Sequence, residues 1–123
     1  MGRARDKGTR FETAFVRHEA EALGDAEGTI RRTALRGTDE GDVYGLFAHG
    51  RRIAVQCKDH RRYELPAWLD AVEEQRGNAD ALAGVVVFHL NGRGIARMGE
   101  QAVLMTVDDF NAILTGERVS DGD

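Results

Sequence analysis

The sequence has few of the features that exported proteins, structural zinc sites and membrane-spanning segments require. Its only cysteine, Cys57, excludes a disulfide within the chain and is compatible with the reducing cytoplasm. Its four histidines lack the spacing of zinc ligands. The charged first residues contain no apolar segment typical of a signal peptide, and no apolar run approaches the roughly 20 residues that span a bilayer. We therefore expect a cytoplasmic protein that does not contact a membrane.

Proline is equally scarce, and the chain has neither repeats nor low-complexity segments. We therefore expect residues 1–123 to form one domain, with a frayed tail over 116–123. Apolar periodicity predicts helices over 6–23, 66–82 and 108–114, the last of them capped by Asp108. Alternating or continuous apolar runs predict strands over 29–36, 42–47, 51–58, 84–90 and 102–107. This order is typical of an α/β fold in which helices flank a mixed central sheet.

The residues that could carry chemistry lie around a predicted hairpin, with Asp42 on one strand and Gln56 and Lys58 on the next. Period-two alternation places Gln56 and Lys58 on one face of their strand. A three-residue turn over 48–50, with Gly50 left-handed, would set Asp42 opposite Gln56 on that face. A two-residue turn at His49-Gly50 would instead set Asp42 opposite Cys57 and separate the cluster. The sequence permits either turn.

These residue types suit phosphodiester hydrolysis with a divalent cation. Mg²⁺ prefers oxygen ligands, which the Asp42 carboxylate, the Gln56 side chain and the Cys57 backbone carbonyl can supply. We expect Mn²⁺ to substitute for it. Lys58 is one of only two lysines among 17 basic residues, and an ammonium group, unlike a guanidinium, can position or deprotonate a water molecule. A further carboxylate is needed for charge, and Glu12 on the first predicted helix is the best-placed candidate.

The pattern resembles the PD-(D/E)xK nuclease superfamily, in particular the archaeal and phage Holliday junction resolvases. The similar segments are Lys7-Gly8-Thr9 with Glu12, Gly37-Thr38 before Gly41-Asp42, and Ile53 to Lys58, within a likeness over residues 5–92. The resemblance implies a restriction-endonuclease-like αβββαβ core and a homodimer. It also assigns catalysis to Glu12, Asp42, Gln56 and Lys58, with Glu12, Asp42 and Gln56 binding the metal.

Two positions depart from that family. Gln56 stands where an acid is expected, and Gly41 stands where proline is usual. A strand reading Val-Gln-Cys-Lys is similar to Mrr-type restriction endonucleases, whose motif also carries glutamine. Glutamine supplies oxygen without charge, so metal binding should depend more on Asp42 and Glu12. Gln75 on the second helix either faces the site, as a glutamine does in RecB-like nucleases, or lies on the surface.

The expected function is hydrolysis of branched DNA by an Mg²⁺-dependent endodeoxyribonuclease, a Holliday junction resolvase of a bacterium or a phage. Residues 1–62 carry 13 lysines and arginines against 10 acids, whereas residues 63–123 carry 4 against 11. The first half is thus suited to phosphate. The residues expected to contact DNA are Lys7, Arg10, Thr38, His60, Arg61 and Arg62.

Other interpretations of the same residues remain open. A Mrr-like or RecB-like nuclease would cut duplex DNA, and an inactive DNA-binding module would keep the fold after losing the acid at Gln56. Glu12 is otherwise a surface carboxylate of a helix, and Asp42 a residue that caps a turn. Trp68 and Tyr63 are expected in the core or in a dimer contact. Phe88 and Phe110 are further apolar candidates for a surface across a two-fold axis.

Overall fold

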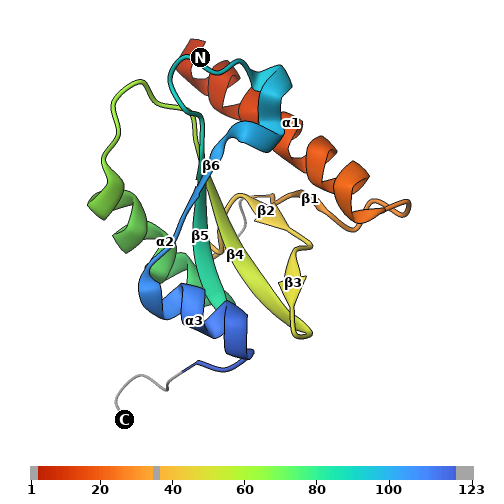
Figure 1. The fold of residues 1–123 in the computed structure, drawn as a ribbon, viewed down its shortest axis with the longest axis vertical. Coiled ribbons are helices and arrows are strands. Elements are labelled where there is room, and N and C mark those ends of the chain that lie inside the picture. Colours follow the sequence, from red (N-terminus) through yellow and green to blue (C-terminus); the bar gives the residue numbers. More distant parts are fainter. Residues whose placement is uncertain (1–2, 35–36, 119–123) are drawn as a thin grey trace.

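The computed structural model describes residues 3–34 and 37–118 (Figure 1). Along the chain the elements are helix α1 (Arg3–Leu23), strands β1 (Arg31–Arg32), β2 (Val43–Tyr44), β3 (Phe47–Ala48) and β4 (Arg51–Lys58), helix α2 (Leu65–Ala79), strand β5 (Ala83–Phe88), 3₁₀ helix η1 (Ile95–Glu100), strand β6 (Ala102–Leu104) and helix α3 (Val107–Thr115). No helix over these residues is long and apolar enough to cross a membrane.

The strands form one mixed sheet in the order β1-β2-β4-β5-β6, with β3 pairing β4 beside β2. Only β4 and β5 run parallel, and α2 forms the crossover that a parallel pair requires. The other pairs are antiparallel. Figure 1 shows α1 and α2 flanking the sheet. The α/β class and the mixed, helix-flanked sheet predicted from the sequence are therefore confirmed.

The core divides into two apolar clusters, and β4 contributes alternate residues to the first of them. Val55 and Cys57 belong to the cluster that includes Phe11 of α1. Gln56 and Lys58, which alternate with them, are half-buried and turn to the other face of the sheet. On that face Trp68 of α2 packs with Val72, Val86 and Phe88. All six residues of β5 are buried, as expected for the continuous apolar run of a central strand.

The hairpin between β3 and β4 has the two-residue turn, so the three-residue turn over 48–50 is wrong. His49 and Gly50 both have positive φ, 55° and 74°, and Ala48 pairs with Arg51. That pairing alone would set Asp42 opposite Cys57. Both residues at the turn are left-handed, as a two-residue turn matched to the twist of the strands requires.

A bulge between β2 and β3 then shifts the register back by one residue. Val43 pairs with Val55, so Gly45 and Leu46 together oppose Ile53. Gly45 has φ 111°, and a Cβ there would lie 2.6 Å from the Thr29 carbonyl oxygen. Glycine is therefore required at the bulge both by its dihedral angle and by the close approach of the neighbouring chain. The restored register sets Asp42 opposite Gln56.

Several predicted boundaries also change. The first strand keeps only Arg31–Arg32 of 29–36, and residues 35–36 lie outside the described part. The N-cap of α3 is Thr106 instead of Asp108, because the Thr106 side chain accepts a hydrogen bond from the Asp109 amide at 3.1 Å. Helix α2 ends at Ala79, where Asp80 turns left-handed so that the chain can enter β5.

The predicted fraying over 116–123 is wrong for its first residues. Arg118 is half-buried and donates a hydrogen bond to the Leu82 carbonyl oxygen at 3.0 Å. It also pairs with Asp109 of α3. Residues 119–123 lie outside the described part of the chain.

Candidate active site

The candidate site lies at a fork in the sheet, where β2 and β4 stop pairing. The Asp42 amide donates a hydrogen bond to the Val55 carbonyl oxygen of β4 at 2.7 Å, and on the other side the Thr33 amide, after β1, donates to the Asp42 carbonyl oxygen at 2.9 Å. Gly41 enters the fork with φ 107°, and a Cβ there would lie 2.7 Å from the Val55 carbonyl oxygen. Proline holds φ near −65°, so the departure from the family pattern at Gly41 has a local physical cause.

The Asp42 carboxylate occupies the space that the fork opens. Its Oδ2 accepts a hydrogen bond from the Cys57 amide at 2.9 Å. Because the amide and carbonyl of one strand residue point to the same side, the Cys57 carbonyl also faces the fork. Burial, together with the negative charges of Glu12 and Asp39, raises the pKa of Asp42 to about 6, against the opposite effect of the Cys57 amide.

Among the residues that the structure describes, Lys58 is the cation whose charge lowers the pKa of Asp42. It is half-buried at the end of β4 and shares a face with Gln56. The spacing of Gln56 and Lys58 along β4 is therefore as predicted. Glu12 and Asp39 disfavour the ionised form of Asp42 while Lys58 favours it, and the net raised pKa leaves Asp42 suited to a positively charged ligand.

Gln56 is held by a glutamine on α2. Its Oε1 accepts a hydrogen bond from Gln75 Nε2 at 2.5 Å. The same Nε2 donates to Asp39 Oδ2 at 3.0 Å. Of the two placements left open for Gln75, the structure has it buried and facing the site. Neither the amide contact nor Asp39 follows from periodicity, because Asp39 lies in a loop.

Glu12 reaches the site from the opposite side of the sheet, on α1. Its Oε1 lies 3.1 Å from Arg32 Nε of β1, and the Glu12 side chain is 21% exposed. Glu12 acts on Asp42 and also on Cys57, whose thiol pKa is raised mainly by burial. The buried thiol is therefore a core group without nucleophilic character. Glu12 is near the fork, and Arg32 neutralises it there.

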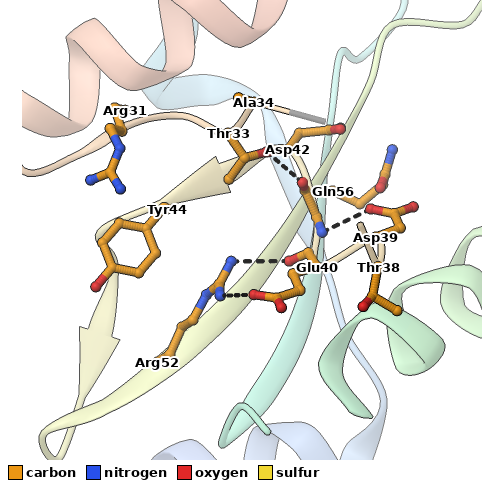
Figure 2. Close-up of a pocket in the computed structure, with 11 residues that line it drawn as sticks. Arg31, Thr33, Ala34, Thr38, Asp39, Glu40, Asp42, Tyr44, Arg52 and Gln56 are labelled. Carbon is orange, nitrogen blue, oxygen red and sulfur yellow. Dashed lines mark hydrogen bonds and ion pairs between the residues drawn. The ribbon is translucent and has the colours of Figure 1, made fainter. Parts of the chain in front are cut away.

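A cavity of about 680 Å³ opens from the fork toward β1 and the hairpin. Asp42, Gln56, Asp39 and Thr38 lie along one wall (Figure 2). The other wall holds Tyr44, whose ring contacts the guanidinium carbons of Arg31 and Arg52 at 4.5 and 5.0 Å from its centroid. Neither Glu12 nor Lys58 lines the cavity.

The basic and aromatic wall was not found from the sequence. Its members Arg31, Tyr44 and Arg52 belong to three different strands, and only the sheet brings them together. Arg52 is also bound to Glu40 at 2.6 Å. Arginine stacked on an aromatic ring keeps its charge accessible to phosphate, so the wall is chemically suited to a nucleic-acid backbone.

The residues expected to contact DNA are scattered around this site. Lys7 pairs with the buried carboxylate of Asp59 at 3.5 Å, which ties α1 to the end of β4. Thr38 lines the cavity. His60 packs near Trp68, with ring centroids 5.9 Å apart. The side chains of Arg10, Arg61 and Arg62 are exposed.

Comparisons with known protein families, with curated proteins and with solved structures find no match. The chemistry of the site must therefore be argued from its own side chains.

The donor atoms at the fork have the chemistry that Mg²⁺ prefers. Over residues 3–34 and 37–118, no three His, Cys, Asp or Glu side chains gather as a metal-binding group. The oxygens present are those of Asp42, of the Gln56 amide and of the Cys57 carbonyl. Mg²⁺ keeps several waters and is bound by one or two carboxylates in many enzymes. A site with few protein ligands therefore fits Mg²⁺ better than a metal that requires a closed set of histidines or cysteines.

Proposed function

We propose that this protein is an Mg²⁺-dependent endodeoxyribonuclease of the PD-(D/E)xK type, with a restriction-endonuclease-like fold, that acts on branched DNA as a Holliday junction resolvase. The observation that carries the proposal is the position of Asp42 at the fork, opposite Gln56 and beside Lys58. The two-residue turn at His49-Gly50 would by itself separate these residues, but the bulge at Gly45 shifts the register back and keeps them together.

In this proposal Asp42, Gln56 and the Cys57 carbonyl hold Mg²⁺, with Glu12 as a further acid near the fork. Bound Mg²⁺ would neutralise charge on the phosphate and lower the pKa of a water molecule. Lys58 would hold the attacking water or stabilise the charge that develops on the phosphate oxygens. Gln75 orients the Gln56 amide through its hydrogen bond of 2.5 Å.

Substrate positioning would come from the basic surroundings of the cavity. Arg31 and Arg52 on the Tyr44 ring face the same space as Asp42. Exposed Arg61 and Arg62 follow directly after β4, near the Lys58 end of the site. Contacts of this kind read the DNA backbone and its shape, not base sequence, which suits a junction enzyme.

The experiment compares a four-way junction with a linear duplex of the same sequence, with Mg²⁺ and with EDTA. Paired cuts in two opposite strands of the junction, dependent on Mg²⁺ and absent from Lys58→Ala, are expected. Equal cutting of the duplex would favour the second candidate, a Mrr-like or RecB-like nuclease, which the Gln75–Gln56 contact also supports. Junction binding without cleavage at any Mg²⁺ concentration would contradict both and leave a DNA-binding module.

A homodimer is part of the resolvase proposal, because paired cuts need two sites related by symmetry. Trp68 and Phe88 are buried in the core of the single chain, so they are not available for a dimer contact. Exposed apolar side chains instead gather on β6 and α3, at Val103, Val107, Phe110 and Leu114. Light scattering should give twice the 13.5 kDa of one chain. A mass of one chain, also on junction DNA, would favour a nicking enzyme.

A further inference from the structure

We propose that Asp39 is the second acidic residue of the cation site and replaces the charge that Gln56 lacks. This inference rests on the proposed function, since it concerns the same cation. Asp39 belongs to the loop between β1 and β2, and the resemblance to known nucleases assigns it no role. The argument depends on how Asp39, Gln56 and Gln75 are held together.

Two oxygens from distant parts of the chain converge on one nitrogen atom. Gln56 Oε1 of β4 and Asp39 Oδ2 of the loop lie 2.5 and 3.0 Å from Gln75 Nε2. Both oxygens therefore point at the same small region beside the cavity that they line. The partially positive NH2 group of Gln75 already lies there, because two oxygen acceptors that face one region need a donor or a cation between them.

The same glutamine carries an unsatisfied atom. Gln75 is only 6% exposed, and its Oε1 is buried without a hydrogen-bond partner in the described ranges. Leaving a buried acceptor unpaired is unfavourable. If a cation bound between the Gln56 and Asp39 oxygens, beside the present position of Nε2, rotation of the Gln75 amide would bring Oε1 to the cation. One cation would then satisfy the Gln75, Gln56 and Asp39 oxygens together.

Asp39 is positioned by its surroundings, although its side chain is exposed. The Gly41 amide donates to its Oδ1 at 3.0 Å. Its backbone carbonyl accepts a hydrogen bond from Asn78 Nδ2 of α2 at 2.8 Å. These bonds hold the loop against α2 and leave Oδ2 directed at Gln75. Little further ordering is needed before a cation can bind, which favours binding.

Asp39 and Asp42 line the same cavity, so both residues border the space that a cation would enter. Mg²⁺ sites commonly use one or two carboxylates. Asp39 and Asp42 would supply two, with Gln56 as a neutral oxygen ligand between them. A glutamine at the position of the motif acid is then compatible with cation binding.

The test is the binding of Mn²⁺ alone to the full chain, without DNA. The electron paramagnetic resonance signal of free Mn²⁺ measures how much of it is bound. Asp39→Asn should weaken binding at least about tenfold, while Asp108→Asn, an exposed acid on α3, should leave it unchanged. Asn preserves the shape of Asp39 and its acceptor for Gly41. Thermal unfolding of each variant checks that it is folded. Adding Gln56→Glu to Asp39→Asn should restore binding to within about threefold of the unchanged protein.

The outcomes separate this inference from the proposed function. If Asp42→Asn abolishes Mn²⁺ binding and Asp39→Asn does not weaken it, Asp39 has no part in the site and the inference is overturned. It is overturned equally if Gln56→Glu fails to rescue Asp39→Asn. If neither Asp42→Asn nor Asp39→Asn changes Mn²⁺ binding, the cation is held elsewhere and the proposed function fails with it.

Discussion

Two aspartates are withdrawn from solvent and held in different ways: Asp109 is buried, and Asp42 is half-buried. Asp109 of α3 is 1% exposed, pairs with Arg118 and also accepts a hydrogen bond from the Gly84 amide at 3.4 Å. Arg118 extends this network to Glu73 of α2 at 3.6 Å. Asp42 accepts a bond from the Cys57 amide, and burial raises its pKa to about 6.

The contrast separates a structural acid from the one that we propose to be functional. A buried charge that is paired and hydrogen-bonded serves to hold elements together, here α3, α2 and the segment after α3. Asp42 has Lys58 nearby but also Glu12 and Asp39, which disfavour its ionised form. A carboxylate whose ionised form is disfavoured by its neighbours, beside a cavity, is typical of a site that binds a ligand. The following predictions test this comparison.

The largest difference should appear in catalysis. Asp42→Asn should lower the rate of Mg²⁺-dependent junction cleavage by about a thousandfold, as when a group that acts in the transition state is removed. Asp109→Asn should keep the rate within about threefold, because neither Asp109 nor Arg118 lines the cavity. Initial rates at a temperature where both variants are folded measure this. Equal losses in both variants would remove the functional distinction.

The next difference concerns stability. Asp109→Asn should lower the free energy of unfolding by about 3 kcal/mol, because it removes the closer acidic partner of the largely buried Arg118 and leaves only Glu73, at 3.6 Å. Denaturant unfolding at neutral pH measures the change. The matched control is Asp108→Asn, an exposed neighbour on the same turn, for which a change within about 0.5 kcal/mol is expected. A loss below about 1 kcal/mol for Asp109→Asn would show that the network does not hold α3.

The smallest effect should have the opposite sign. In EDTA, Asp42→Asn should raise the free energy of unfolding at pH 7 by about 1–2 kcal/mol, because it removes an ionised group that burial disfavours. The folded protein holds the Asp42 proton more tightly, so the penalty develops as pH rises from 3.8 to about 6. The gain should therefore vanish near pH 4. A stabilisation that is equal at pH 4 and pH 7 would contradict the raised pKa.

Much of the fold followed from local pattern. The end of α1 at Leu23 before left-handed Gly24, the buried run of β5 and the alternation of β4 all reflect apolar periodicity and turn residues. Of the two turns that the sequence permits, the structure has the one at His49-Gly50, and the register still sets Asp42 opposite Gln56. The compensating bulge at Gly45 depends on the approach of Thr29, which no short-range pattern contains.

The candidate site, like the fold, could be predicted in part from local pattern. The sequence by itself determined that Gln56 and Lys58 share one face of β4 and that Val55 and Cys57 take the other, because side chains of a strand alternate. Only the tertiary structure decided that Asp42 lies opposite Gln56 and that Asp39 meets Gln75, 36 residues away in sequence. Periodicity specifies the face of an element. Which side chains meet across elements depends on bulges, turns and the docking of α2, and these are settled only when the whole core packs.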